Sequence, residues 1–358
     1  MGQPDARQAP GSGELRQSQA GRAANRTPSK VEQRILRARA RLREESILGE
    51  YGPDAIGLAL REGTGSKAVP ARATIARVLA RRGVLDGVRR QRRPAPPKGW
   101  YLPGVAAGEA ELDSFDFIED LKIADGPLVS VLTATSLHGS LAQAWIMAPV
   151  RAQTTVQALL ERWRREGLPR YAQFDNDTVF QGAHQFPDTV GRVSRLCLAL
   201  GVSPVFAPPR EPGFQNAIEG FNALWQSKVW GRYHFPDLEA LKATSTAYIR
   251  AYRAKTAPRR EAAPARRPVP EDFRLDLNAP LKGTMIYLRR SDERGAVHLL
   301  GKAFDVERHW AHRLVRCEVD FTRRRIRFYA LRRREPSAQP LLRTVPYHRP
   351  NKPFQGKP

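Results

Sequence analysis

Acidic and amide side chains gather directly after one apolar segment and supply oxygen atoms that could bind a cation. The stretch FDNDTVFQG places Asp175 and Asp177 after the run YAQF, which is typical of a buried strand. A polar cluster at a strand end is either an ordinary Asx turn or a site for a metal ion. This stretch alone leaves both interpretations open.

A predicted helix downstream adds one more carboxylate. In GFQNAIEGFNALWQSKVW, apolar side chains recur at spacings of three and four, which predicts a helix with one face packed on a sheet. A neighbouring polar row contains Glu219, which can point back toward the strand ends. Taken alone, a solvated glutamate is the simpler explanation. The apolar row is Phe214, Ile218, Phe221 and Trp225, and the polar row is Gln215, Glu219, Asn222 and Gln226.

The third carboxylate must come from the early strand-like segment ELDSFDFIED. Asp113 and Asp116 are three residues apart, so they face opposite sides of a strand and only one can join the cluster. Alternation does not choose between them, because both faces of this segment carry apolar residues. The choice stays open at the level of residue pattern.

Together, LDSFD, FDND and QNAIEGFN resemble the Asp, Asp, Glu catalytic core of retroviral-type integrases and bacterial insertion-sequence transposases. Matching the motifs residue by residue assigns Asp113 to the first, Asp175 to the second and Glu219 to the third. These three are therefore the expected catalytic and metal-binding residues. The chain departs from the family pattern in carrying Asp177 where the family has glycine, and in a longer spacing that we place in the loop 182–191.

The resemblance implies phosphoryl transfer with two Mg²⁺ or Mn²⁺ ions in each active site. Three converging carboxylates repel one another, and hard divalent cations relieve that repulsion. Two ions roughly 3.5–4 Å apart can hold a phosphodiester between them. The expected function is cleavage at the ends of a DNA element and joining of its 3′-hydroxyls to target DNA. The alternative is a catalytically inactive, sequence-specific DNA-binding protein, a repressor or a domesticated transposase.

The elements that must position these residues fall into three predicted domains, which are joined by two linkers and flanked by two tails. Three strand-like runs followed by alternating helices and strands favour an α/β core, which the resemblance implies is a ribonuclease H-like mixed five-stranded sheet with helices. The predicted boundaries are 1–27 for a disordered basic tail, 28–90 for an all-α helix-turn-helix DNA-binding domain, 91–104 for a proline-rich linker, 105–256 for the integrase catalytic core, 257–279 for a second linker, 280–347 for a small SH3-like β-barrel that binds DNA, and 348–358 for a tail.

Residues 70–82 are predicted to form the recognition helix of the helix-turn-helix. Apolar side chains occupy one stripe of this segment and arginines the rest, although a small bundle with solvated arginines explains the pattern equally. Near the third acidic motif, polar residues around Glu219 are further candidates for contacting DNA. The predicted DNA-binding residues are Arg72, Arg77, Arg81, Gln215, Asn216 and Lys228.

Composition indicates a polyanionic partner. The 358 residues carry a formal net charge of +24, which favours double-stranded DNA, here the element ends and the target. The resemblance implies a homo-oligomer on DNA and a place in the bacterial cytoplasm at the nucleoid, while a helper ATPase is neither indicated nor excluded. No apolar run approaches the length of a membrane span. Cys197 and Cys317 are expected to be buried thiols in a reducing compartment, without zinc spacing.

Overall fold

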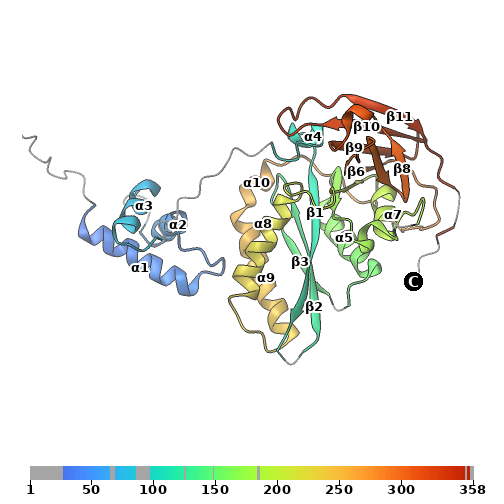
Figure 1. Cartoon of the computed structure of the whole chain (residues 1–358). Helices are drawn as coiled ribbons and strands as arrows, with labels where there is room; N and C mark the ends of the chain where they lie inside the picture. Colours follow the sequence, from blue (N-terminus) through green and yellow to red (C-terminus); the bar gives the residue numbers. More distant parts are fainter. Residues whose placement is uncertain are drawn as a thin grey trace, which may run out of the picture. The chain divides into compact units, whose positions relative to one another are not determined.

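The chain forms two compact units in the computed structural model, residues Met1–Arg89 and Arg90–Pro358 (Figure 1). Most of the predicted N-terminal tail and the start of the predicted first linker fall outside the residues that the structure describes. Those residues are 27–64, 69–85, 97–124, 126–147, 149–183, 186–350 and 353–354.

The described residues of the first unit form three helices, α1 (Ser29–Glu45), α2 (Pro53–Thr64) and α3 (Arg72–Arg81). They pack around a small apolar cluster that includes Ile35, Ile56, Ile75, Val78 and Leu79, all fully buried. Helix α3 coincides with the predicted recognition helix. The assignment of this unit as a DNA-binding helix-turn-helix stays a prediction.

The second unit is built on one nine-stranded sheet in the order β11-β10-β9-β6-β5-β4-β1-β2-β3. Five of its strands match the predicted core. Strands β1, β4 and β5 are parallel, and β1, β2 and β3 pair antiparallel, so the sheet is mixed and fits a ribonuclease H-like core. The five strands are β1 (Leu112–Lys122), β2 (Leu128–Ser136), β3 (Gln143–Met147), β4 (Tyr171–Phe174) and β5 (Ser203–Phe206).

Helices cover both faces of this sheet, with α5 and α7 on one side and α8 and α9 on the other (Figure 1). The buried row of α8 contains Ile218, Phe221 and Trp225, which confirms the apolar stripe expected from the sequence. The helices of the core are α4 (Pro103–Ala106), α5 (Ala152–Glu166), α6 (Thr178–Gln181), α7 (Arg192–Ala199), α8 (Asn216–Trp225), the π-helical turn η1 (Gln226–Trp230), α9 (Leu238–Lys255) and α10 (Ala257–Glu261).

The C-terminal strands continue the core sheet, which differs from the predicted separate barrel at 280–347. Strand β6 pairs parallel with β5 at Val205↔Ile286 and Phe206↔Tyr287, and the rings of Phe206 and Tyr287 stack with centroids 5.1 Å apart. The edge of β5 that a five-stranded sheet would leave open is thereby paired. These elements are β6 (Thr284–Arg290), β7 (Ala296–Leu299), β8 (Lys302–Asp305), the 3₁₀ turn η2 (Arg308–Trp310), β9 (Leu314–Asp320), β10 (Arg325–Leu331) and β11 (Leu341–Pro346).

The predicted linkers also belong partly to the packed unit. Trp100, Tyr101 and Leu102 are at most 3% exposed and share a hydrophobic cluster with Phe214, which precedes α8, and with residues of the C-terminal strands. In the second predicted linker, 257–279, helix α10 forms and Arg267 pairs with Leu168. The first predicted linker packs onto the core because Trp100, Tyr101 and Leu102 are consecutive large apolar side chains that are buried there. No helix among the described residues is long and apolar enough to cross a membrane.

Candidate active site

Asp113 lies inside a buried cluster of positive side chains on the α5 side of the sheet. Arg162 and Arg266 donate to both of its carboxylate oxygens, with Arg162 Nε 2.9 Å and Arg266 Nη2 2.6 Å from Oδ2. Trp163 Nε1 adds a longer contact of 3.3 Å to Oδ2. Asp113 and Arg162 are both fully buried. Asp113 therefore ties strand β1 to helix α5 and to the segment that follows α10.

The charge state of Asp113 follows from these contacts. Burial alone would raise its pKa, but the charges and hydrogen bonds of Arg162 and Arg266 outweigh burial and hold the pKa well below its usual range. The carboxylate is an anion whose oxygens are occupied by arginines. This arrangement contradicts the prediction that Asp113 is the first metal ligand. The physical reason is that its face of β1 packs on α5, away from α8.

Asp116, the alternative left open by the sequence, lies on the other face of β1, under α8. Burial, together with the charges of Asp175 and Glu219, raises its pKa to about 7. Asn222 Nδ2 donates to Asp116 Oδ2 at 2.8 Å, and Thr133 Oγ1 donates to Asn222 Oδ1 at 2.6 Å. The charges of Asp175 and Glu219, the two other predicted acidic residues, thus both act on Asp116. The side-chain amide of Asn222 fixes the orientation of the Asp116 carboxylate.

Asp175 ends β4 and opens a tight turn. Its Oδ1 accepts from the backbone N–H of Asp177 at 2.9 Å, and Asp177 Oδ1 accepts from Val179 N at 2.6 Å as the N-cap of α6. Asp177 has a φ of −60°, so this turn does not require the glycine of the family motif. Burial raises the pKa of Asp175, and the charges of Asp177 and Glu119 raise it further. The stretch is an Asx turn, and it also presents a carboxylate with a raised pKa.

The loop after Asp175 is held by the C-terminal half of the chain. Arg289 on β6, which is 8% exposed, donates from Nη2 to Asn176 Oδ1 at 2.9 Å. Asn176 Nδ2 in turn donates to the carbonyl of Ala207 at 2.8 Å, and Arg289 Nη1 reaches the same carbonyl at 3.4 Å. Sequence reasoning missed Arg289, because nothing in the residue pattern relates it to a turn 113 positions earlier.

Glu219 stands in the first turn of α8 and is exposed, so its side chain has room to change rotamer. Of the predicted DNA contacts nearby, Asn216 is exposed at the start of the helix and Lys228 lies in the π-helical turn η1. Gln215 is the N-cap, and its Nε2 is buried without a hydrogen-bond partner in the described part of the chain. The roles of these three residues in DNA binding stay predictions.

The geometry of the acidic residues falls short of a closed metal site. Across the described residues, no group of three histidine, cysteine, aspartate or glutamate side chains is placed to hold a metal ion. Asp116, Asp175 and Glu219 nevertheless come from β1, the end of β4 and α8, and two of them act electrostatically on the third. Both cysteines are buried free thiols, as expected from the sequence.

The arginines predicted to read DNA from α3 differ in their surroundings. Arg72 pairs with Asp54 at 2.8 Å, and both side chains are more than 70% exposed. Within the part of the chain that the structure describes, Arg77 bonds inside its own helix, to the carbonyl of Ala73 and the hydroxyl of Thr74. Arg81 is engaged by Glu32 of α1, which is 2% exposed and also bonds Arg82 at 2.6 Å. Arg81 therefore stabilises the three-helix unit, and its use on DNA stays a prediction.

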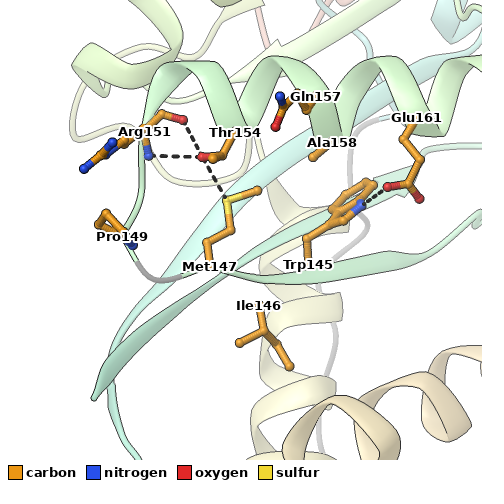
Figure 2. Close-up of a pocket in the computed structure, with 9 residues that line it drawn as sticks. All are labelled: Trp145, Ile146, Met147, Pro149, Arg151, Thr154, Gln157, Ala158 and Glu161. Atoms are coloured by element: carbon orange, nitrogen blue, oxygen red, sulfur yellow. Dashed lines mark hydrogen bonds between the residues drawn. The ribbon is translucent and has the colours of Figure 1, made fainter. Parts of the chain in front are cut away.

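A groove between edge strand β3 and helix α5 lies on the α5 side of the sheet (Figure 2). Figure 2 shows Trp145 directed at Glu161, whose Oε2 accepts from Trp145 Nε1 at 3.3 Å. Glu161 is the one acidic side chain among the described residues that line this groove, so it offers no carboxylate cluster. The groove is therefore not a second candidate active site.

No family model and no curated protein matches this chain. Among solved structures, it is similar to the catalytic core domain of BIV integrase, with 17% identity over 38% of this chain and 80% of that one, and a TM-score of 0.28. It is also similar to the simian T-cell lymphotropic virus intasome in complex with the PP2A regulatory subunit B56 gamma, with 13% identity over 74% of this chain and 88% of that one, and a TM-score of 0.35. Both similarities are weak, so the strand order and the side-chain contacts described above define the fold and the candidate site.

Proposed function

We propose that the chain is a transposase or integrase that cuts and joins DNA strands, with Asp116, Asp175 and Glu219 as its acidic triad. One observation carries the proposal. The pKa of Asp116 is raised to about 7 by burial together with the charges of Asp175 and Glu219. This electrostatic coupling supports a common site for carboxylates from two strands and one helix.

The chemistry of this donor set fits divalent Mg²⁺ or Mn²⁺. A carboxylate whose pKa is raised by neighbouring carboxylates is stabilised as the anion by a nearby cation, and hard divalent ions prefer oxygen ligands. Two such ions, when bound, activate the attacking oxygen and stabilise the leaving oxygen of a phosphodiester. Asp116, Asp175 and Glu219 would hold them, and the exposed Glu219 is the side chain with the most freedom to turn inward.

The other residues of the site keep the acidic side chains oriented. Asn222, fixed by Thr133, presents its amide to Asp116 Oδ2 and so orients this carboxylate. Asn176, fixed by Arg289, holds the turn in which Asp175 stands. Such supporting contacts position ligands before substrate arrives, which is how a strand-transfer enzyme limits reorganisation during the reaction.

A basic groove on the C-terminal strands suits the DNA backbone. It has a volume of about 780 Å³, and Glu211 in its lining precedes α8 in the chain. Arg333 of this groove donates to the carbonyl of Pro212 at 2.7 Å, so the groove adjoins the loop that leads to the helix of Glu219. We infer that double-stranded DNA lies along it, with a homo-oligomer on the DNA. The cations of the groove are Arg290, Arg313, Arg332, Arg333 and Arg334.

The test is Mg²⁺- or Mn²⁺-dependent nicking of supercoiled plasmid that carries the DNA flanking the coding region. Glu219→Gln and Asp116→Asn should each abolish nicking while DNA affinity stays within about twofold, because the substitutions remove ligand charge without touching the basic surface. Glu161→Gln, on the far face of the sheet, is the matched control and should nick normally. Wild-type protein that binds these ends tightly but never nicks them would favour the inactive DNA-binding alternative.

A further inference from the structure

Two arginines of the basic groove converge on one carboxylate. Arg290, at the end of β6, bonds Oε1 of Glu211 with its Nε 2.5 Å away, and Arg333 Nη2 lies 3.6 Å from Oε2. These side chains come from distant segments, since Glu211 precedes Arg290 by 79 positions. Glu211 is 17% exposed, whereas Arg290 and Arg333 are 47% and 43% exposed. The carboxylate therefore fills a site that two positive side chains form at the protein surface.

Further contacts hold both guanidinium groups in place. Arg290 Nη1 donates to the carbonyl of His312 at 2.5 Å. Arg333 Nη2 donates to the carbonyl of Pro212 at 2.7 Å, and its guanidinium lies 5.2 Å from the ring centroid of Phe214. An arginine that is already oriented loses little side-chain freedom when it binds an anion. The pair is therefore an organised anion site and differs from two solvated surface charges.

The loop that carries Glu211 can move without moving α8. Arg210 has a φ of 58°, in the left-handed region that costs a non-glycine residue free energy. Loss of the Glu211 contacts would let Arg210 relax. At the other end of the loop, Phe214 is 4% exposed, and its carbonyl accepts from the hydroxyl of Tyr101 at 2.9 Å. Movement of the loop should therefore end at Phe214 and leave Glu219 in place.

We propose that Arg290 and Arg333 bind a backbone phosphate of duplex DNA, and that Glu211 fills this site in the absence of DNA. A carboxylate and a phosphodiester both accept charge-assisted hydrogen bonds from guanidinium groups, so one can replace the other. A single free phosphate would exchange one ion pair for another, whereas a duplex also engages the other arginines of the groove. Glu211 thereby limits binding to ligands that present several phosphates. This inference rests on the proposed function, because it specifies how that substrate is bound.

The experiment is a double-mutant cycle on duplex affinity, measured by fluorescence anisotropy with the full chain in EDTA. A duplex of unrelated sequence serves as the probe, because phosphate contacts do not depend on sequence. Glu211→Gln should raise affinity by about 2- to 30-fold, the worth of two ion pairs near a protein surface. In a protein that also carries Arg290→Gln and Arg333→Gln, the same substitution should give no gain, because the carboxylate then has no cation to occupy.

Glu335→Gln is the matched control. Glu335 is the other acidic side chain among the described residues that line the groove, and it pairs with Arg332 at 2.9 Å. Its removal changes the net charge of the groove by the same amount, so any gain should persist in the protein that lacks Arg290 and Arg333. An equal gain from Glu211→Gln with and without these two arginines would show that only net charge matters and would overturn the proposal.

A second variant and a second ligand complete the test. Glu211→Ala removes the acceptor altogether and should also raise affinity only when Arg290 and Arg333 are present. No gain in either Glu211 variant, each folded by circular dichroism, would contradict the displacement. Sodium phosphate should compete with the duplex for wild-type protein no better than sodium chloride of equal ionic strength. Stronger competition by phosphate would assign the site to free phosphate instead of DNA.

These readouts separate the inference from the proposed function. Binding in EDTA reports on the groove alone, because no metal-dependent cutting takes place there. A gain that depends on Arg290 and Arg333, in a wild-type protein that never nicks DNA in Mg²⁺, would refute only strand transfer. Normal nicking together with a gain that is independent of these arginines would refute only the role of Glu211.

Discussion

Arg289 on β6 donates a 2.9 Å hydrogen bond to Asn176, the residue that follows Asp175 at the end of β4. The guanidinium also bonds the carbonyls of Ala207 and His298, so it joins three segments of the chain at one point. A residue of the C-terminal strands thereby fixes the turn that carries a candidate catalytic aspartate.

Arg289→Lys should lower Mg²⁺-dependent nicking by about 10- to 100-fold, the usual cost of removing a group that orients a metal ligand. Lysine keeps the charge but lacks the planar fork that reaches Asn176 and Ala207 together. Initial nicking rates against Mg²⁺ concentration measure the effect. Arg164→Lys, which replaces an exposed arginine on α5, should behave as wild type, and equal loss in both variants would contradict a specific role for Arg289.

Asp113→Asn and Asp116→Asn should have opposite consequences. Removing one partner from a buried ion pair costs about 3–5 kcal/mol, so Asp113→Asn should lower the free energy of unfolding by that order. Asp116→Asn removes a charge that its surroundings disfavour and should leave stability unchanged or slightly higher, while nicking disappears. Urea unfolding and nicking, measured on the same preparations, show which aspartate supports stability and which supports catalysis. A stable but inactive Asp113→Asn variant would identify Asp113 as the first metal ligand.

The free energy of unfolding should decrease in acid because Asp113 becomes protonated. The arginines depress its pKa in the folded state, so its contribution is present above the unfolded pKa of about 3.9 and is lost as pH falls below that value towards the folded pKa. We expect the urea midpoint of the wild type to drop more steeply between about pH 4 and pH 2 than that of Asp113→Asn. Parallel curves for the two proteins would show that the carboxylate is not held by Arg162 and Arg266.

Asn222 and Thr133 should act as one unit on Asp116. Asn222→Ala removes the donor to the carboxylate, and Thr133→Val removes the hydroxyl that orients Asn222, so each should reduce nicking by about 10- to 100-fold. The double variant should be little worse than Asn222→Ala alone, because both changes break the same chain of hydrogen bonds. Independent, additive losses in a double-mutant cycle would contradict the network.

DNA affinity should depend steeply on salt. A protein that neutralises 6–10 phosphates loses about 10³–10⁵ in affinity between 50 and 200 mM salt. Replacing Arg332, Arg333 and Arg334 by glutamine should reduce the log–log slope by about 0.9 for each phosphate that the protein no longer neutralises. Fluorescence anisotropy over a salt series measures this, with Arg164→Gln on α5 as the control. If the triple variant has the same salt dependence of DNA affinity as the wild type, DNA does not bind along the C-terminal groove.

The sequence predicted the order of the acidic motifs, the apolar row of α8 and the mixed core sheet. The residue pattern left the first aspartate open and the family resemblance assigned Asp113, because both faces of β1 are apolar and the deciding partner of Asp113, Arg266, is 153 residues away. The pairing of β5 with β6 was not predicted either, because the two strands are far apart in the sequence and parallel strands pair without a local turn signal. Local patterns specified the elements, whereas contacts between distant segments specified which face each side chain uses.

The unbroken sheet through β5 and β6 bears on how this chain can change over time. A terminal region that shared no backbone pairing with its neighbour could be exchanged between genes as a cassette. Here an exchange near residue 270 would strip hydrogen bonds from β5 and bare a strand edge prone to aggregation. New preferences for DNA are therefore expected to arise by substitution in the arginine-bearing turns, not by shuffling of the whole C-terminal half.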